Sequence, residues 1–363
     1  MKKVGLIGMT ALLAACLEPQ LAPQLAERSS ADFTIEVVAD GLNTPWGAAE
    51  LADGSFVVTE KQGALKHIKN DGEIVDIKGL PSGIFTQGQG GLLDVHAEAD
   101  GHLLMSHSYG TWDANGTALI RAKLEGDRLV GATEIYRAAP PKAAASHFGG
   151  RIQTLPGGDI ILTLGDGFSE REAAQNPESH LGKIMRIHAN GAPPAVYTLG
   201  HRNVQGVHYD AQSGALWAHE HGPRGGDELN LIIEGENYGW PVATSGLDYN
   251  GAKISPFKTY DGMTAPVHDW VPSIAPSGLT IYRGELFAGW NGDAFVGGLA
   301  SRDLRHLKIE NGKVIKEEKL LGDMQARIRD VRTGSDGSLL ILNNTKIDME
   351  PGGGQLLRLT PKK

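Results

Sequence analysis

The chain has 363 residues and a formal net charge of −9 at pH 7. This negative charge argues against nucleic acid as a default partner and disfavours binding to an anionic membrane surface. With 49 glycines and 40 % hydrophobic residues, the composition suits many short strands joined by tight turns. It disfavours a protein built from long helices.

Residues 1–16 predict an export signal of the lipoprotein type rather than a part of the fold. Lys2 and Lys3 precede an apolar run, residues 4–15, that is too short to span a bilayer. The run ends at Leu13-Ala14-Ala15-Cys16, which resembles the lipobox of bacterial lipoproteins. The alternative is an ordinary signal peptide with an incidental cysteine. We expect an exported, periplasmic protein that meets the membrane only through a lipid anchor at Cys16, with residues 17–31 as a tether.

From residue 32 onward, β-rich segments alternate with turns. Alternating or β-branched patterns predict strands at residues 33–38, 55–59, 103–107, 160–164 and 339–342. Turn dipeptides that end in glycine recur near residues 53, 100, 157, 213, 291 and 336. Six units of this length match four-stranded blades with long loops. We therefore predict one all-β domain over residues 32–363, a six-bladed β-propeller with four-stranded antiparallel blades. A pair of β-sandwiches is the rival, but it would not repeat one turn context six times.

The sequence lacks the motifs of several common enzyme classes. It has no glycine-rich dinucleotide motif that opens a helix, no phosphate-binding loop, no serine nucleophile elbow and no zinc-protease helix motif. His219 and His221 would place two imidazoles on one strand face, as in a zinc pair. Such a pair without a third ligand is more often structural.

The most informative stretch runs from His219 to Pro241. Its glycines and Pro223 favour an irregular backbone whose carbonyls can point inward, and Asp227 and Glu228 follow in the same loop. Carbonyl and carboxylate oxygens are the ligands that calcium takes. On composition alone, a calcium site and a glycine-rich turn with solvated acids are equal alternatives.

This stretch resembles the calcium- and cofactor-binding region of the soluble pyrroloquinoline-quinone (PQQ)-dependent sugar dehydrogenases. These form the glucose/sorbosone dehydrogenase family, and the bacterial aldose sugar dehydrogenase branch is the nearer likeness. The likeness extends from Asn43-Thr44-Pro45-Trp46-Gly47 to Arg327-Ile328-Arg329-Asp330-Val331. Members of that family are six-bladed propellers, in agreement with the turn count. The resemblance implies a quinoprotein oxidoreductase that oxidises the anomeric carbon of aldose sugars to lactones.

The resemblance also implies roles for individual residues. His147, in Ser146-His147-Phe148-Gly149-Gly150, matches the catalytic base that takes a proton from the anomeric hydroxyl. Arg202 and Asn203 match a pair that contacts the quinone near its reactive carbonyl, and of the two Arg202 is also implied to be catalytic. Three further residues match quinone-binding positions, namely Gln89, Arg327 and Arg329.

The same resemblance implies two calcium ions in addition to PQQ. Gly222 and Pro223 match the backbone carbonyl ligands of the calcium that also holds the cofactor. Asp227, Glu228 and Tyr238 resemble ligands of a second, structural calcium.

The residue types suit this chemistry. PQQ is a flat quinone with three carboxylates, and arginines offer planar, permanently charged, bidentate partners for such groups. Arg327 and Arg329 lie two residues apart on a predicted strand and so share a face. We also expect neighbouring arginines to lower the pKa of His147 and keep it in its neutral form.

The sequence departs from the family pattern at two positions. Ser146 stands where relatives often carry Asp or Asn before the base. A lysine that contacts the cofactor in relatives would fall near Ala300-Ser301, where none occurs, and Arg302 is the substitute we consider. Trp270 is predicted either to stack at the mouth of the site or to pack between blades.

Two other classes remain as alternatives. A calcium-dependent propeller hydrolase acting on lactones would use the calcium and His147 but would need no arginine cluster. An extracellular binding propeller would have neither base nor cofactor. The partners implied by the leading hypothesis are a small-molecule sugar and an electron acceptor, and the sequence leaves a homodimer open.

Overall fold

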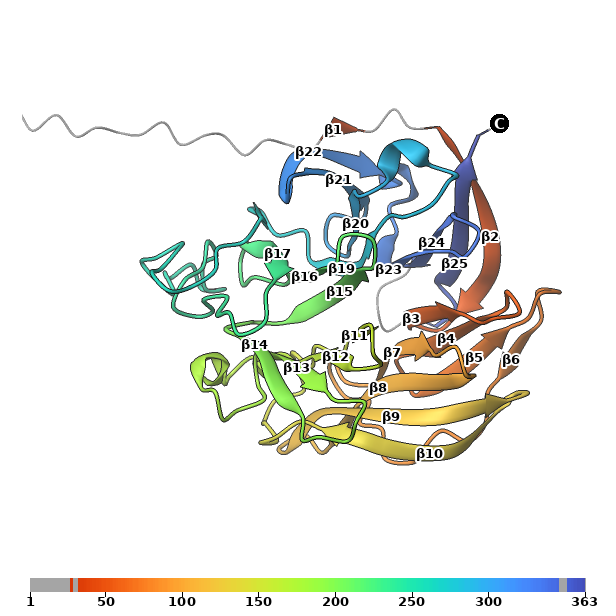
Figure 1. Cartoon of the computed structure of the whole chain (residues 1–363), viewed down its shortest axis with the longest axis horizontal. Coiled ribbons are helices and arrows are strands. Elements are labelled where there is room, and N and C mark those ends of the chain that lie inside the picture. The colour runs from red at the N-terminus through yellow and green to blue at the C-terminus, as the bar shows by residue number, and fades with distance from the viewer. Residues whose placement is uncertain (1–26, 29–31, 346–350, 363) are drawn as a thin grey trace, which may run out of the picture.

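The computed structural model of the chain describes residues 27–28, 32–345 and 351–362. Cys16, the predicted signal and most of the predicted tether lie outside the described residues. The strands form six sheets set around a common axis (Figure 1). The prediction of a six-bladed propeller with four-stranded antiparallel blades is therefore confirmed.

The first three blades follow one another along the chain. Blade 1 consists of β3 (Pro45–Glu50), β4 (Phe56–Glu60), β5 (Ala64–Ile68) and β6 (Ile74–Asp76). Blade 2 consists of β7 (Leu92–Ala97), β8 (His102–Gly110), β9 (Asn115–Glu125) and β10 (Arg128–Arg137). Blade 3 consists of β11 (Ile152–Thr154), β12 (Ile160–Thr163), β13 (Lys183–Ile187) and β14 (Ala195–Leu199).

The other three blades complete the ring. Blade 4 consists of β15 (Val204–Asp210), β16 (Ala215–Glu220), β17 (Asp227–Ile232) and β18 (His268–Trp270). Blade 5 consists of β19 (Pro276–Ile281), β20 (Ala294–Gly298), β21 (Leu304–Glu310) and β22 (Lys313–Leu320). Blade 6 consists of β23 (Arg327–Thr333), β24 (Leu339–Asn344), β25 (Gly354–Pro361) and β2 (Phe33–Leu42).

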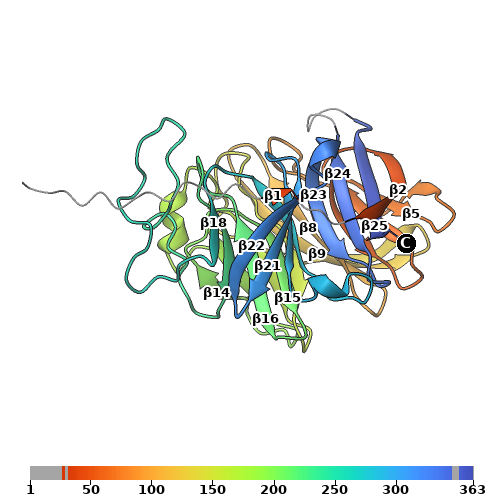
Figure 2. The same ribbon diagram turned by 90° about the horizontal axis from the view of Figure 1, so that it is seen from above.

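The helical elements of the described residues are three short 3-10 turns, η1 (Arg171–Gln175), η2 (Ala288–Trp290) and η3 (Gly322–Met324). Each of the six recurring turn dipeptides joins the first strand of a blade to the second, as Asp53-Gly54 joins β3 to β4. The one long gap between turns comes from an insertion between β17 and β18, at residues 233–267. This insertion extends outward from the ring in both views (Figures 1 and 2).

The two ends of the chain close the ring. β2, from the start of the described domain, pairs antiparallel with β25, from its end, so that Phe33 lies opposite Pro361. A short strand β1 (Glu27–Arg28), within the predicted tether, pairs parallel with β22 of blade 5. Apolar side chains fill the spaces between neighbouring blades, and Val57, Leu92 and Met105 are fully buried between blades 1 and 2. Among the described residues, none forms a helix with the length and apolar character that a membrane crossing requires.

Ring geometry decides where a site can form. The first strand of each blade is the innermost, and neighbouring innermost strands pack on one another around the axis. All six run in the same direction, so the segments that precede them meet at one end of the axis. The sequence motifs before β7, β11, β15 and β23 are therefore brought to the same place.

Candidate active site

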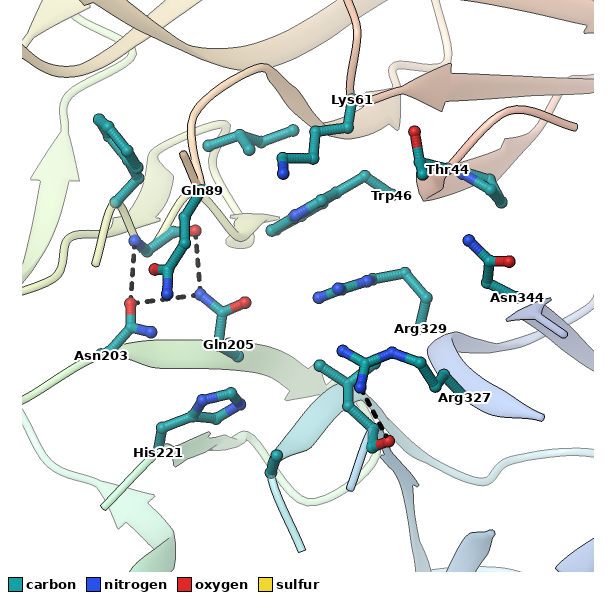
Figure 3. Close-up of a pocket in the computed structure, with 16 residues that line it drawn as sticks. Thr44, Trp46, Lys61, Gln89, Asn203, Gln205, His221, Arg327, Arg329 and Asn344 are labelled. Carbon is teal, nitrogen blue, oxygen red and sulfur yellow. Dashed lines mark hydrogen bonds between the residues drawn. The ribbon is translucent and has the colours of Figure 1, made fainter. Parts of the chain in front are cut away.

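A cavity of about 190 Å³ lies at this end of the axis, where all six blades contribute to its wall (Figure 3). Most of its lining residues stand just before or at the start of an innermost strand. The lining is formed by Thr44, Pro45, Trp46, Lys61, Gln89, Leu93, Phe148, Gly149, Asn203, Gln205, His221, Ala275, Leu299, Arg327, Arg329 and Asn344. Four of the predicted quinone-binding residues are thus brought together: Gln89, Asn203, Arg327 and Arg329.

Three cationic side chains reach the cavity from blades 6 and 1. Arg327 and Arg329 both line it, as expected for residues on the same face of β23. The guanidinium of Arg329 lies 6.0 Å from the centroid of the Trp46 ring. The third cation is Lys61, whose ammonium donates a hydrogen bond to the Gly88 carbonyl at 2.7 Å. The cavity therefore combines positive charge with a flat aromatic face.

Lys61 was missed by the sequence analysis, which considered Arg302 as the substitute for the absent lysine. Arg302 is exposed and is not among the lining residues of the cavity. Lys61 follows β4 directly, and the end of this second strand returns to the cavity because it is antiparallel to β3. Ser146, the other departure from the family pattern, is half-buried just before His147.

Amide side chains at the start of blades 2 and 4 are held by hydrogen bonds. The Asn203 side-chain oxygen accepts hydrogen bonds from the Gly149 backbone N–H at 3.2 Å and from the Gln205 side chain at 3.3 Å. Gln89 accepts a hydrogen bond from the His147 backbone N–H at 2.8 Å. These bonds fix the orientation of three polar side chains that line the cavity.

His147, the predicted base, is buried beside the cavity and is not among its lining residues. Its Nδ1 lies 2.6 Å from a carboxylate oxygen of Asp166. The other oxygen of Asp166 accepts a hydrogen bond from the indole N–H of Trp240 at 2.8 Å. Because Asp166 is an acceptor when ionised, Nδ1 carries a proton and Nε2 keeps the free lone pair.

The electrostatic setting favours a neutral imidazole. Burial has the largest effect on His147 and lowers its pKa. The hydrogen bond to Asp166 raises the pKa, and the positive charge of Arg202 lowers it further. The expected direction is confirmed, although burial rather than arginine is the main cause. Burial alone would raise the pKa of Asp166, but its hydrogen bond with His147 helps to hold that pKa below the usual value.

Arg202 is buried beside His147 and does not line the cavity. Its guanidinium donates to the Gly222 carbonyl at 2.7 Å, to the His221 carbonyl at 3.1 Å and to the Tyr249 hydroxyl at 3.2 Å. The carbonyl predicted to bind calcium therefore already accepts a hydrogen bond from the predicted catalytic arginine. The Arg202 backbone is fixed in turn by Glu220, which accepts its N–H at 2.5 Å.

A buried ionic cluster joins the blades beneath the cavity. The guanidinium of Arg151 contacts carboxylate oxygens of Asp94 at 3.3 Å and Asp330 at 3.0 Å. It also donates to the Arg329 carbonyl at 3.0 Å and lies 4.1 Å from the centroid of the Trp46 ring. Arg151 thus supports two residues of the cavity wall from below.

The residues predicted for the second calcium do not behave alike. Asp227 accepts four hydrogen bonds, from the Gly222 N–H, the Ser273 hydroxyl and the N–H groups of residues 274 and 275. This carboxylate braces the loop, and its role as a calcium ligand stays a prediction. The hydroxyl of Tyr238 donates to the Leu231 carbonyl at 2.7 Å. The role of Tyr238 as a calcium ligand also stays a prediction.

Glu228 has the surroundings of a cation ligand. It lies directly opposite Glu220 on β16 and opposite Asp269 on β18, and like charges placed in this way repel each other. Burial and then the charge of Glu220 raise the pKa of Glu228 well above its usual value. Beside them, the side-chain oxygen of Asn230 is buried with no hydrogen-bond partner. These oxygens fit a bound cation, which would relieve both the repulsion and the unpaired acceptor.

The alternatives considered for His219, His221 and Trp270 are decided by their contacts. Nε2 of His219 lies 2.8 Å from the Gly278 carbonyl, and Nε2 of His221 lies 2.8 Å from the Pro276 carbonyl. Within the described ranges, the one group of three His, Cys, Asp or Glu side chains whose ligand atoms all lie within 4.8 Å of one another is Glu98, Asp100 and His102, where the turn after β7 leads into β8. Trp270 is buried in the core and donates to Glu317 at 2.9 Å, so it packs rather than stacking at the mouth.

The sequence matches the family described as Glucose / Sorbosone dehydrogenase over residues 42–350. The chain belongs to the glucose/sorbosone dehydrogenase family. This membership confirms the resemblance that the motifs indicated, and it makes the chain a sugar oxidoreductase.

Similar proteins extend over nearly the full chain. Aldose sugar dehydrogenase YliI of Escherichia coli (strain K12) is 34 % identical over 356 residues, which cover 92 % of this chain and 94 % of that protein. The apo-form structure of the soluble aldose sugar dehydrogenase from Escherichia coli has a TM-score of 0.85 at 33 % identity and covers 91 % of this chain and all of that one. The PQQ-bound form of aldose sugar dehydrogenase from Streptomyces coelicolor has a TM-score of 0.74 at 26 % identity, with coverage of 92 % and 99 %.

Proposed function

We propose that the protein is a quinoprotein aldose dehydrogenase, which binds PQQ in the axial cavity and oxidises the anomeric carbon of an aldose to a lactone. The observation that carries the proposal is the cavity wall, where three cations and a flat indole face one space. This chemistry suits a flat anion with several carboxylates. A family relative solved in its PQQ-bound form supports the same assignment.

The residues of the wall have distinct parts in binding. Arg327 and Arg329 would pair with carboxylates of the cofactor, and Lys61 would add a third positive charge from blade 1. The indole of Trp46, supported from below by Arg151, would face the rings. Gln89 and Asn203 would orient the cofactor by hydrogen bonds, because their amides are already fixed by partners.

His147 would accept the proton of the anomeric hydroxyl at Nε2, the nitrogen that Asp166 leaves unprotonated. When bound, the quinone supplies the acceptor for the hydride that leaves the anomeric carbon, and calcium supplies Lewis-acid polarisation. Arg202 would place its fixed positive charge beside the reacting groups. Proton and hydride together account for the two electrons and two hydrogens that separate an aldose from its lactone.

Calcium enters the proposal at two places. The carbonyls of Gly222 and Pro223 would hold the ion next to the cofactor, and that ion would share the Gly222 oxygen with Arg202. The second ion would lie at half-buried Glu228, which faces the buried Glu220 and the exposed Asp269 across neighbouring strands. For the second site, the unfolding temperature of wild type and Glu228→Gln would be measured with calcium and with a chelator. Calcium should raise the value more for wild type than for the variant, which keeps only the first site; equal effects on both proteins would remove Glu228 from the site.

Reconstitution tests the proposed function. The full chain, purified without cofactor, would be mixed with PQQ and calcium, freed of unbound quinone, and tested for reduction of an artificial dye by a panel of aldoses. We expect retained quinone absorbance and sugar-dependent dye reduction. Protein that retains no absorbance and shows no activity with any aldose would overturn the proposal. Retained quinone with dye reduction by lactones or alcohols instead of aldoses would correct the substrate class.

The cellular setting is a further part of the proposal. The motif at Cys16 supports export to the periplasm and lipid anchoring there, where an electron acceptor would reoxidise the quinone. Membrane fractionation of cells that express wild type or Cys16→Ser tests the anchor. Wild type should sediment with membranes and the variant should be soluble in the periplasm. Equal soluble fractions would leave an ordinary signal peptide as the explanation.

A further inference from the structure

Behind the predicted base lies a buried lysine that the proposed reaction does not use. Lys142 is 3 % exposed. Its ammonium donates to the side-chain oxygen of Asn115 at 2.7 Å and to the Ala144 carbonyl at 2.8 Å, and it lies 3.9 Å from the centroid of the Phe148 ring. All three partners are uncharged. Burial lowers the pKa of Lys142 to about 7.

The contacts of Lys142 fix the segment that carries His147. Ala144 and His147 have φ values of 67° and 52°, in the left-handed region that is costly for residues other than glycine. The surroundings must therefore hold these residues in place. The ammonium of Lys142 holds the Ala144 carbonyl, and the backbone of Lys142 pairs with that of Asn115 on β9 at 2.8 and 2.9 Å.

The stem of the lysine packs on the other partner of the base. A Cβ added to Gly167 would lie 2.4 Å from Cδ of Lys142, so the backbone next to Asp166 rests closely on this side chain. Gly167 leaves room for that approach, with φ of 75°. Lys142 thus contacts both the segment before His147 and the loop that carries its hydrogen-bond partner.

Charged or titratable groups from four segments surround the His147 imidazole. Asp166 follows β12 and favours its protonation, whereas Arg202, after β14, opposes it. His221, after β16, is coupled to the ring as a further titratable group. Lys142, five residues before His147, opposes protonation together with Arg202. The ammonium therefore offsets part of the effect of the Asp166 carboxylate.

We propose that Lys142 is a positioning residue for the base: its ammonium holds the segment at Ala144 and supplies a positive charge that keeps the His147 imidazole neutral. The proposal rests on the proposed function, since that function makes His147 the base. The proposal gives a role to Lys142, a residue behind the site that would touch neither the sugar nor the cofactor.

The test uses variants that separate charge from hydrogen bonding. Lys142→Gln keeps a donor but removes the charge, and Lys142→Arg keeps the charge. Titration of the ¹⁵N-labelled histidine rings by NMR gives the midpoint for His147, whose signal is the one missing in His147→Gln. We expect Lys142→Gln to raise that midpoint by about one pH unit, since loss of a nearby positive charge favours the imidazolium. Lys142→Arg should stay close to wild type.

Lys183→Met is the matched control. Lys183 is also fully buried, and its ammonium donates to three carbonyls, those of residues 173, 174 and 181. This variant should leave the His147 midpoint unchanged. A folded Lys142→Gln protein with an unchanged midpoint, or an equal shift in Lys183→Met, would overturn the proposal.

Two further measurements keep the test decisive. If Lys142→Gln does not fold, Asn115→Leu removes the amide oxygen that accepts from the ammonium while keeping the lysine. This variant should raise the midpoint by a smaller amount; no change would contradict the proposal. In reconstituted enzyme, the acidic limb of kcat/KM should move to higher pH by the same amount as the NMR midpoint. The NMR titration needs no turnover, so failure of dye reduction in wild type would count against the proposed function and not against Lys142.

Discussion

The two sides of the axial cavity hold their charges in different ways. On the side of blades 6 and 1, Arg327, Arg329 and Lys61 reach the cavity wall. On the side of blades 3 and 4, His147 and Arg202 are buried and each is fixed by polar partners. A group that binds an anion must present its charge to the cavity, whereas a base needs a fixed tautomer and a low pKa. Under the proposed function, this difference would place the charged contacts to the cofactor on one side and the base on the other.

Replacing the base should distinguish most clearly between loss of turnover and loss of cofactor binding. His147→Ala removes the imidazole but keeps the backbone N–H that binds Gln89. We expect kcat to fall by about 10²- to 10⁴-fold, the usual contribution of a general base, while the affinity for PQQ changes little. Turnover by dye reduction and cofactor binding by absorbance titration check the two halves. Loss of binding along with turnover would show that the sides are not independent.

Asp166→Asn should have a smaller effect on the same side. An amide can accept at Nδ1–H but carries no charge, and hydrogen bonds to charged groups contribute about 1.5–3 kcal/mol, so kcat/KM should fall roughly 10- to 100-fold. The hydrogen bond with Asp166 raises the pKa of His147 in wild type. The acidic limb of kcat/KM should therefore move to lower pH in the variant. If the acidic limb of kcat/KM does not move in Asp166→Asn, the titration of His147 is not what determines that limb.

The pairing of His147 with Asp166 also shows what the sequence could and could not predict. The recurring turn dipeptides were sufficient for the fold, because each blade repeats the same first hairpin. Most predicted quinone contacts stand before an innermost strand, within contiguous motifs, and the ring gathers them at one end. Asp166 and Lys61 instead follow second strands, β12 and β4. Their partners are set by the packing of the blades, which no local motif records.

Arg327→Gln tests the opposite side of the cavity. A glutamine can still donate one hydrogen bond, but the bidentate, charged contact with a carboxylate is lost. We expect PQQ to bind roughly 10-fold more weakly, with kcat at saturating cofactor close to wild type. Calorimetric titration and turnover at high PQQ concentration measure the two quantities. A fall in kcat at full cofactor occupancy would contradict the division between the sides.

Lys61→Gln should give the smallest change and the most specific one. Lys61 is only half-buried, and pairs of this kind contribute up to about 1 kcal/mol, so PQQ should bind a few-fold more weakly. Because exposed ion pairs are screened by salt, the difference between wild type and variant should shrink as ionic strength rises. Lys78→Gln, at a surface lysine that pairs with Asp76 at 3.4 Å, is the control and should not change PQQ affinity. A salt-independent loss in Lys61→Gln would mean that the side chain acts through the Gly88 carbonyl and the shape of the wall. In that case the positive charge on this side would come from the two arginines of β23 alone.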